Sequence, residues 1–465
     1  MVQNTTSVSY AGALLIRNAA AVMTGRAGDA ARAGAADIRI RDGRIAEIGA
    51  ALPRHDGEDL IDATGCVVYP GWVNTHHHLF QNLLKAVPSG MNAGLEQWLA
   101  SVAYPRLARF TPEIFRTAVR LGMAELLLSG TTTCADHHYL YHHGHGAETG
   151  DVLFEVAEEL GMRLVLCRGG AIQSASDHPG MRATALVPET LDEMLTDIER
   201  LKARYHDASG DGLRRVVVAP TTPTFSLPPV WLRELASFAR GLDLRLHSHL
   251  SETDYVRFCR EKYQCTPVQF VADHDWLGPD VWFAHLVTVN PEEIRMLAVT
   301  NTGMAHCPVS NARLGSGIAP VRAMADAGVP ISLGVDGVAS NESGSMVHEA
   351  NFAWLVHRAL GGAAQTRVEE VIHWGTAGGA RVLGLPGIGT LAPGQSADLA
   401  IYDVSGLRFH GFHDIGTAPV AAGEPTPVRD VLVRGRQVVR DGAVVGLDLE
   451  KLRREAREAL ATLVD

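Results

Sequence analysis

Short apolar runs alternate with amphipathic helical patterns through most of the chain, and this alternation restricts the fold more than any other feature. Eight runs have the length and apolar content of buried strands. They are Cys66–Thr75, Thr131–Ala135, Arg163–Cys167, Val216–Pro220, Leu244–His249, Trp282–Leu286, Gly303–His306 and Ile331–Val335. Because strands separated by helices form parallel sheets, the pattern favours an α/β fold, a (β/α)8 TIM-like barrel. A doubly wound sheet is the alternative that the pattern leaves open.

Two helices of this region carry clear signals. Thr111-Pro112-Glu113 has the pattern of an N-cap followed by proline at the first helical position, and Gly130 follows as a stop. Apolar residues between Leu191 and Tyr205 recur on one helical face.

Both ends of the chain are strand-rich instead. Asp42-Gly43 joins two alternating runs, which predicts a hairpin, and residues 397–402 and 431–439 repeat this pattern. Neither end is large enough to fold alone, so we expect one small β-sandwich built from both termini. The expected division is residues 1–68 and 391–465 for the sandwich, the latter with a C-terminal helix, and 69–390 for the barrel. That helix, Leu452–Leu463, packs either on its own barrel or on a partner in a homo-oligomer.

Composition and net charge limit which kinds of partner and which cellular compartment we expect. The chain has 465 residues and a formal net charge of −11, which argues against nucleic acid or an anionic membrane as a partner. No apolar stretch is long enough to span a bilayer, and no secretory signal pattern opens the sequence. Its six cysteines form no CxxC pair, as expected of reduced thiols in a cytoplasmic protein.

Three consecutive histidines, His76-His77-His78, end the first run. Residues two apart on a strand point the same way, so His76 and His78 converge while His77 faces backwards. Four later strands also end in polar residues, in His249 and Glu252, His285, His306 and Asp336. A lone histidine is usually a core or surface residue, but five such strand ends on one rim of a barrel indicate a divalent metal.

Four segments together resemble the amidohydrolase superfamily, in the branch that deaminates purine-, pyrimidine- and pterin-like rings. They are Pro70–His78, His249–Glu252, Ala284–His285 and Leu333–Asn341. The resemblance implies a metal-dependent aminohydrolase. It implies metal ligation by His76, His78, His249 and Asp336, and catalytic acid–base roles for Glu252, His285 and Asp336. We expect the ion to be zinc, with iron as the alternative, since both suit such a set.

One metal ion is expected rather than two. Binuclear members of the superfamily use a lysine on strand four, whereas Val216–Thr222 contains none. The H-x-E and P-C-x-x-C motif of cytidine deaminases and the H-E-x-x-H motif of zinc proteases are also absent.

Five residues are expected to contact a small heterocyclic substrate: Gln81, Trp98, Tyr139, Arg168 and Thr222. The Gln81 amide can pair with a ring carbonyl and its adjacent N–H. Trp98 either stacks on the ring or packs a loop. Arg168 either binds an oxo group or forms a structural ion pair. The roles of His77, His137 and His138 stay open. His137 and His138 can either contact the substrate or hold a metal ligand in place.

Within the superfamily, the closest resemblance is to pterin deaminases that act on isoxanthopterin. It rests on Asn74–Gln81, Arg168–Gly170, Arg214–Thr222 and Ile372–Arg381. We therefore expect release of ammonia from an oxidised pterin ring, with 8-oxoguanine as the alternative substrate and triazine hydrolysis as a more distant one. A metal-holding scaffold without turnover is disfavoured because both proton-transfer residues are present. Ring-opening hydrolysis is disfavoured because the strand-four lysine is missing.

Overall fold

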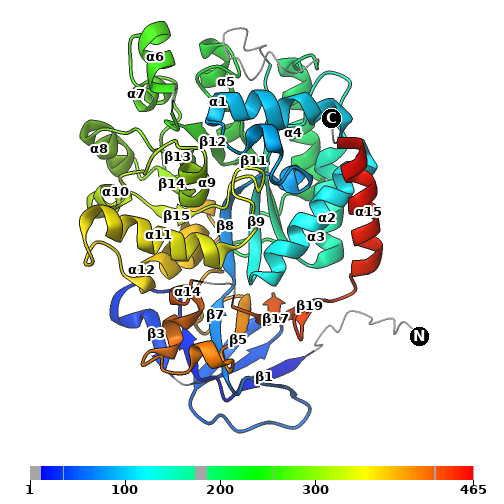
Figure 1. Cartoon of the computed structure of the whole chain (residues 1–465), viewed down its shortest axis with the longest axis vertical. Helices are drawn as coiled ribbons and strands as arrows, with labels where there is room; N and C mark the ends of the chain where they lie inside the picture. Colours follow the sequence, from blue (N-terminus) through cyan, green and yellow to red (C-terminus); the bar gives the residue numbers. More distant parts are fainter. Residues whose placement is uncertain (1–11, 35, 173–185, 254, 424–425, 464–465) are drawn as a thin grey trace.

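The computed structural model describes residues 12–34, 36–172, 186–253, 255–423 and 426–463. A barrel of strands ringed by helices stands on a smaller β layer, and that layer contains segments from both ends of the chain (Figure 1). None of the helices in these described ranges is long and apolar enough to cross a membrane.

The barrel is a sheet of eight strands in sequence order, with every neighbouring pair parallel. Its strands are β8 (Trp72–His77), β9 (Thr131–His138), β10 (Arg163–Arg168), β11 (Arg214–Val218), β12 (Leu246–Leu250), β13 (Val281–His285), β14 (Gly303–His306) and β15 (Ile331–Leu333). A bridge between His77 and Asp336 brings the last strand back to the first. The expected barrel is confirmed, and the doubly wound alternative is excluded.

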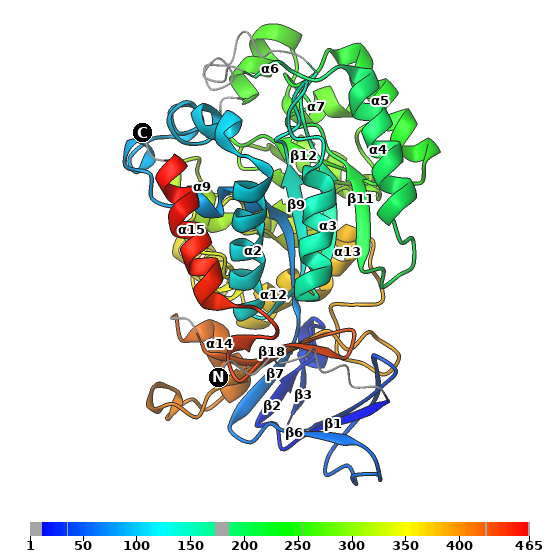
Figure 2. The same cartoon turned by 90° about the vertical axis from the view of Figure 1, so that its right-hand side faces the viewer.

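Helices surround the barrel and extend beyond the carboxyl ends of its strands (Figures 1 and 2). They are α2 (Pro112–Leu128), α3 (Thr149–Leu160), α4 (Leu191–Tyr205), α5 (Pro229–Gly241), α6 (Tyr255–Tyr263), α7 (Pro267–Ala272), α8 (Pro291–Val299), α9 (Pro308–Arg313), α10 (Val321–Ala327), α11 (Met346–Gly361), α12 (Val368–His373) and α13 (Gly379–Leu383). Helix α2 begins where its sequence predicts, because the Thr111 hydroxyl accepts a hydrogen bond from the Ile114 N–H.

The two termini form two further sheets, of order β5-β4-β1-β6 and β19-β18-β17-β16-β7-β2-β3. Their strands are β1 (Ala13–Arg17), β2 (Ala21–Met23), β3 (Arg32–Gly34), β4 (Asp37–Arg41), β5 (Arg44–Gly49), β6 (Asp59–Asp62), β7 (Cys66–Pro70), β16 (Leu399–Asp403), β17 (Val428–Val433), β18 (Arg436–Arg440) and β19 (Ala443–Val444). Ile16 and Ile38 of one sheet share a core with Val68 and Ile401 of the other, so the sheets pack as a sandwich. The predicted hairpin is present, with positive φ at Asp42 and Gly43.

The apolar run Cys66–Thr75 is not one strand, which corrects the prediction. Its first half, β7, pairs with β16 and β2 in the sandwich, whereas its second half, β8, pairs with β9 in the barrel. Gly71 lies at the change of sheet, where a Cβ atom would come within 2.2 Å of the Thr132 side chain. Both halves are buried, in different cores, so the run stays apolar and hydropathy alone does not show the break.

The C-terminal helix α15 (Leu449–Leu463) packs on α2 of its own barrel (Figure 2). It also reaches the connection between β8 and α2, in which residues 86–110 fold over the carboxyl ends of the strands; we call these residues the cap. The cap contains α1 (Leu95–Trp98) and the turn Tyr104–Arg109. From that turn, Arg106 Nε donates to the carbonyl of Leu463 over 2.9 Å.

Candidate metal centre and active-site pocket

Four predicted ligands meet at the carboxyl ends of the barrel strands. His76 and His78 come from β8, His249 from β12 and Asp336 from the residues just after β15, and their donor atoms all lie within 4.8 Å of one another. Asp336 Oδ1 is 3.3 Å from His76 Nε2 and 3.1 Å from His78 Nε2. His249 Nε2 is 3.2 Å from His78 Nε2. Such spacing suits ligands that each reach about 2.0–2.2 Å toward one central cation.

Hydrogen bonds from Nδ1 fix the ring orientations of His78 and His249. His78 Nδ1 donates to the carbonyl of His137, and His249 Nδ1 donates to that of Thr221, each over 2.6 Å. In the neutral form of each ring, donation through Nδ1 leaves the lone pair on Nε2, and both Nε2 atoms face the cluster.

The third histidine is oriented through a relay. His247 Nδ1 donates to the carbonyl of Trp282 over 2.9 Å, so its Nε2 is an acceptor. His76 Nδ1 lies 2.8 Å from that acceptor and must be the donor. The buried Nε2 of His76 then carries a lone pair and has no hydrogen-bond partner among the described residues. A buried lone pair left in this state fits a cation site.

Asp336 is held from both backbone and side chain. His77 points away from the cluster, as predicted, and its Nδ1 donates to the Asp336 carbonyl over 2.6 Å. Ser310 Oγ donates to Asp336 Oδ2, also over 2.6 Å. Although burial disfavours a charge, the contacts with His76 and His78 hold the pKa of Asp336 well below its usual range. The carboxylate is therefore ionised and available to a cation.

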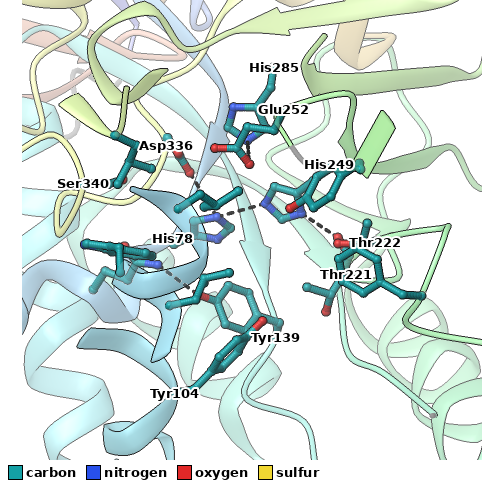
Figure 3. Close-up of a pocket in the computed structure, with 17 residues that line it drawn as sticks. His78, Tyr104, Tyr139, Thr221, Thr222, His249, Glu252, His285, Asp336 and Ser340 are labelled. Carbon is teal, nitrogen blue, oxygen red and sulfur yellow. Dashed lines mark hydrogen bonds and ion pairs between the residues drawn. The ribbon is translucent and has the colours of Figure 1, made fainter. Parts of the chain in front are cut away.

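A pocket with an empty volume of about 490 Å³ opens beside this cluster. Figure 3 shows the side chains that line it. They are His78, Gln81, Leu95, Trp98, Leu99, Tyr104, Tyr139, Thr221, Thr222, Phe225, His249, Glu252, Tyr255, His285, Leu314, Asp336 and Ser340. Its walls combine aromatic rings with a few polar groups, as expected of a site for a small planar ligand.

Glu252 and His285 lie together in this pocket, on the same side of the metal-ligand histidines (Figure 3). Glu252 Oε2 is 3.6 Å from His285 Nε2, and Asn311 Oδ1 accepts from His285 Nδ1 over 2.9 Å. Burial raises the pKa of Glu252 above its ordinary value. Its Oε1 has no hydrogen-bond partner among the described residues, so it is free to exchange a proton with a ligand.

Four of the five predicted substrate contacts line the pocket: Gln81, Trp98, Tyr139 and Thr222. Gln81 Nε2 donates to the Tyr139 hydroxyl over 2.9 Å, and Gln81 Oε1 is left without a described partner. Trp98 Nε1 donates to the Ala339 carbonyl over 3.1 Å, which ties the cap to the segment after Asp336.

Arg168 is not among the lining residues, and this corrects the expectation that it reads the substrate. Its Nη1 and Nη2 donate to Glu189 over 2.6 and 2.7 Å, and its Nε donates to Asp197 over 3.0 Å. The physical reason is strand alternation. Arg168 shares its face of β10 with Leu166, which packs in the core that includes the surrounding helices, whereas Cys167 faces the barrel interior.

The structure also brings in residues that the sequence did not single out. Ser310 and Asn311 orient Asp336 and His285, and the only sequence signal for them was their place shortly after the strand-seven residue His306. Tyr104 and Tyr255 line the pocket from the cap and from α6, where a tyrosine carries no recognisable motif.

The remaining rim histidines lie around the site without lining it. His306 pairs with His357, with Nε2 atoms 3.0 Å apart. His137 supplies its carbonyl to His78, and His138 Nε2 lies 2.7 Å from Thr149 Oγ1.

Known proteins are similar to this chain over nearly its whole length. The pattern of the Amidohydrolase family matches residues 67–438. The chain is 51% identical to an isoxanthopterin deaminase from an unknown prokaryotic organism, over 97% of both chains. It is 43% identical to the 8-oxoguanine deaminase of Pseudomonas aeruginosa, over 97% of this chain and 98% of the relative.

Two solved structures share the fold. One is an amidohydrolase from an environmental sample of the Sargasso Sea, with a TM-score of 0.84, 48% identity and coverage of 97% of this chain and 98% of that one. The other is the atrazine chlorohydrolase of Arthrobacter aurescens complexed with zinc, with a TM-score of 0.89, 29% identity and coverage of 96% and 100%. The chain belongs to the amidohydrolase family.

Proposed function

We propose that the protein is a mononuclear metal-dependent deaminase that hydrolyses the amino group from isoxanthopterin and releases ammonia. The observation that carries this proposal is the buried pair of Glu252 and His285 beside the His76, His78, His249 and Asp336 cluster. A proton donor next to a cation site, inside a pocket walled by aromatic rings, is the arrangement that hydrolysis of an amidine-like ring carbon needs.

His76, His78, His249 and Asp336 would hold the metal ion. We favour Zn²⁺, with Fe²⁺ as the alternative, because three neutral imidazoles and one carboxylate suit both. When bound, the ion supplies a positive charge that lowers the pKa of water toward neutrality. The orphaned Nε2 of His76 and the fixed tautomers of His78 and His249 support this assignment.

The proton transfers fall to three residues of the pocket. Asp336 accepts a proton from the attacking water, and His285 orients that water. Glu252 delivers a proton to the ring nitrogen beside the attacked carbon, which makes that carbon more electrophilic. A C–O bond forms, the C–N bond to the amino group breaks, and the amine leaves with the transferred proton as ammonia. Burial raises the pKa of Glu252, so this carboxyl holds a proton to a higher pH than an ordinary glutamate does.

The choice of ring rests on the lining residues and on the relatives. Gln81 presents an unpartnered Oε1 that can accept from a ring N–H, and Tyr139, Thr222 and the flat face of Trp98 complete the expected contacts. The 51% identical relative is an isoxanthopterin deaminase, which supports isoxanthopterin as the substrate. The 43% identical relative makes 8-oxoguanine the second candidate. We place the reaction in the cytoplasm, where the six free thiols of the chain would persist.

The test is ammonia release by the zinc-loaded protein from isoxanthopterin, pterin, 8-oxoguanine and guanine. We expect the highest kcat/KM on isoxanthopterin. Activity on 8-oxoguanine alone would replace isoxanthopterin with the second candidate. No ammonia from any of the four rings by a folded, metal-loaded protein would refute the proposal.

A further inference from the structure

We propose that Tyr104 determines specificity by hydrogen-bonding the extra ring oxygen that distinguishes isoxanthopterin from pterin. This inference rests on the proposed function and deepens it. It assigns to a residue of the cap the recognition that Arg168 cannot provide from outside the pocket.

The Tyr104 hydroxyl faces the pocket without a protein hydrogen-bond partner among the described residues. Its side chain lines the pocket and is 6% exposed. No described residue forms a hydrogen bond with the phenol group, whereas the neighbouring Tyr139 hydroxyl already accepts one from Gln81. A pocket-lining hydroxyl that has no protein partner is available to donate to a ligand oxygen, and in this largely buried site such a bond is stronger than in water. Burial also raises the pKa of Tyr104, so the phenol keeps its proton and can donate.

The position of Tyr104 matches the far edge of a bound ring. In Figure 3, Glu252 and His285 lie on one side of His78 and His249, while Tyr104 lies on the opposite side. The amidine carbon must lie near Glu252 and the metal ligands, so the second ring extends toward the cap. In isoxanthopterin the extra oxygen is on that second ring.

The charge of the pocket fits the same assignment. Among the described residues that line it there is no lysine or arginine. An oxygen on the second ring is therefore met by neutral donors, which favour the neutral lactam over its anion.

Tyr104 is also held firmly in place. Two residues further on, Arg106 donates through Nε to the carbonyl of Leu463, and through Nη1 to those of Ser101 and Val102, over 2.8–2.9 Å. The C-terminal helix thus fixes the turn that carries Tyr104. A hydroxyl fixed before the ligand arrives gives more selectivity than a mobile one, because less entropy is lost on binding.

The experiment compares Tyr104→Phe with the unmodified enzyme on two substrate pairs, isoxanthopterin with pterin and 8-oxoguanine with guanine. We expect kcat/KM on isoxanthopterin to fall about tenfold, the usual effect of one lost hydrogen bond, and kcat/KM on pterin to stay within about twofold. Equal falls on both members of a pair, or no fall on either, would overturn the proposal. Tyr141→Phe is the matched control, because the Tyr141 hydroxyl is buried without a described partner and lies outside the pocket; this change must leave the substrate ratios unaltered.

Calorimetric titration separates failure of this inference from failure of the proposed function. If the unmodified protein releases no ammonia from any ring, the deaminase proposal fails, and binding to the zinc-loaded protein still tests Tyr104. The assignment is supported if the unmodified protein binds isoxanthopterin more tightly than pterin and Tyr104→Phe removes this difference in affinity. An unchanged affinity ratio, or no preference to begin with, would refute it.

Discussion

Ser310 Oγ lies 2.6 Å from Asp336 Oδ2, so one oxygen of the carboxylate is held by a hydroxyl while the other faces His76 and His78. Ser310 takes no part in the proposed proton transfers. Its hydrogen bond to Oδ2 orients Asp336 so that Oδ1 faces the metal-ligand cluster. Positive φ at Asp336 places the carboxylate on a backbone conformation that needs such external support.

Ser310→Ala is expected to weaken the metal site and to leave the fold intact. Without the hydroxyl, Asp336 can rotate, and loss of a group that orients a ligand typically lowers metal affinity about 10- to 100-fold. Competition with a chromophoric chelator measures this change. Ser129→Ala, at the end of α2 and away from the cluster, serves as the control and should keep the original affinity. Equal affinities in Ser310→Ala and the unmodified protein would show that Ser310 does not position Asp336.

Glu252→Gln should separate metal binding from turnover. Glutamine preserves the shape of the side chain and cannot exchange the proton, so we expect stoichiometric metal and a kcat at least about 100-fold lower. Elemental analysis and ammonia release on the same preparation give both values. Activity within a few-fold of the unmodified enzyme would remove Glu252 from the proton transfer.

Much of this centre could be predicted because it follows from two simple geometric rules. Alternation along a strand brings His76 and His78 to the same side, and the barrel brings the ends of β8, β12 and β15 to one rim. These two rules do not predict where the side chains of loop residues lie. Tyr104 lies on the cap, and the turn that carries it is tied through Arg106 to Leu463, far along the chain. The sheet change at Gly71 was equally hidden, since it depends on contact with Thr132 rather than on any change in hydropathy.

The substrate-binding prediction for Arg168 rests on its residue type and does not consider which face of β10 carries the side chain. Its guanidinium pairs with Glu189, whose side chain is 4% exposed. Arg168→Met would leave that carboxylate buried and unpaired, and we expect a loss of about 3 kcal/mol in the free energy of unfolding. Substrate preference should not change, because Arg168 is outside the pocket. Denaturant unfolding and kcat/KM ratios are the measurements.

The control for that change is Arg204→Met. Arg204 also pairs with a carboxylate, that of Asp151, but its side chain is 57% exposed, so its loss should cost less than about 1 kcal/mol. A shift of Arg168→Met toward pterin or guanine, with normal stability, would restore the substrate-binding role.

His357 makes stability depend on pH at a place remote from the pocket. Burial, followed by the nearby charge of Arg322, lowers the pKa of His357 from 6.5 to about 4, and burial also holds the pKa of its neighbour His306 well below the ordinary value. In the unfolded chain these rings titrate near 6.5. Between pH 6.5 and 4 the unfolded state therefore binds more protons than the folded state. The contribution of His357 is complete above pH 6.5 and is lost as the pH falls toward 4.

His357→Gln tests this linkage, because glutamine can still bond to His306 Nε2 but does not titrate. From pH 7 to pH 5, the free energy of unfolding should fall by about 2 kcal/mol less in this variant than in the unmodified protein. Both proteins have the same metal ligands, so the effect of protonating those ligands on the free energy of unfolding cancels in the comparison. His410→Gln, an exposed site, should follow the unmodified curve. If His357→Gln follows it too, the ring is already protonated in the folded state, and burial between β14 and α11 does not keep it neutral.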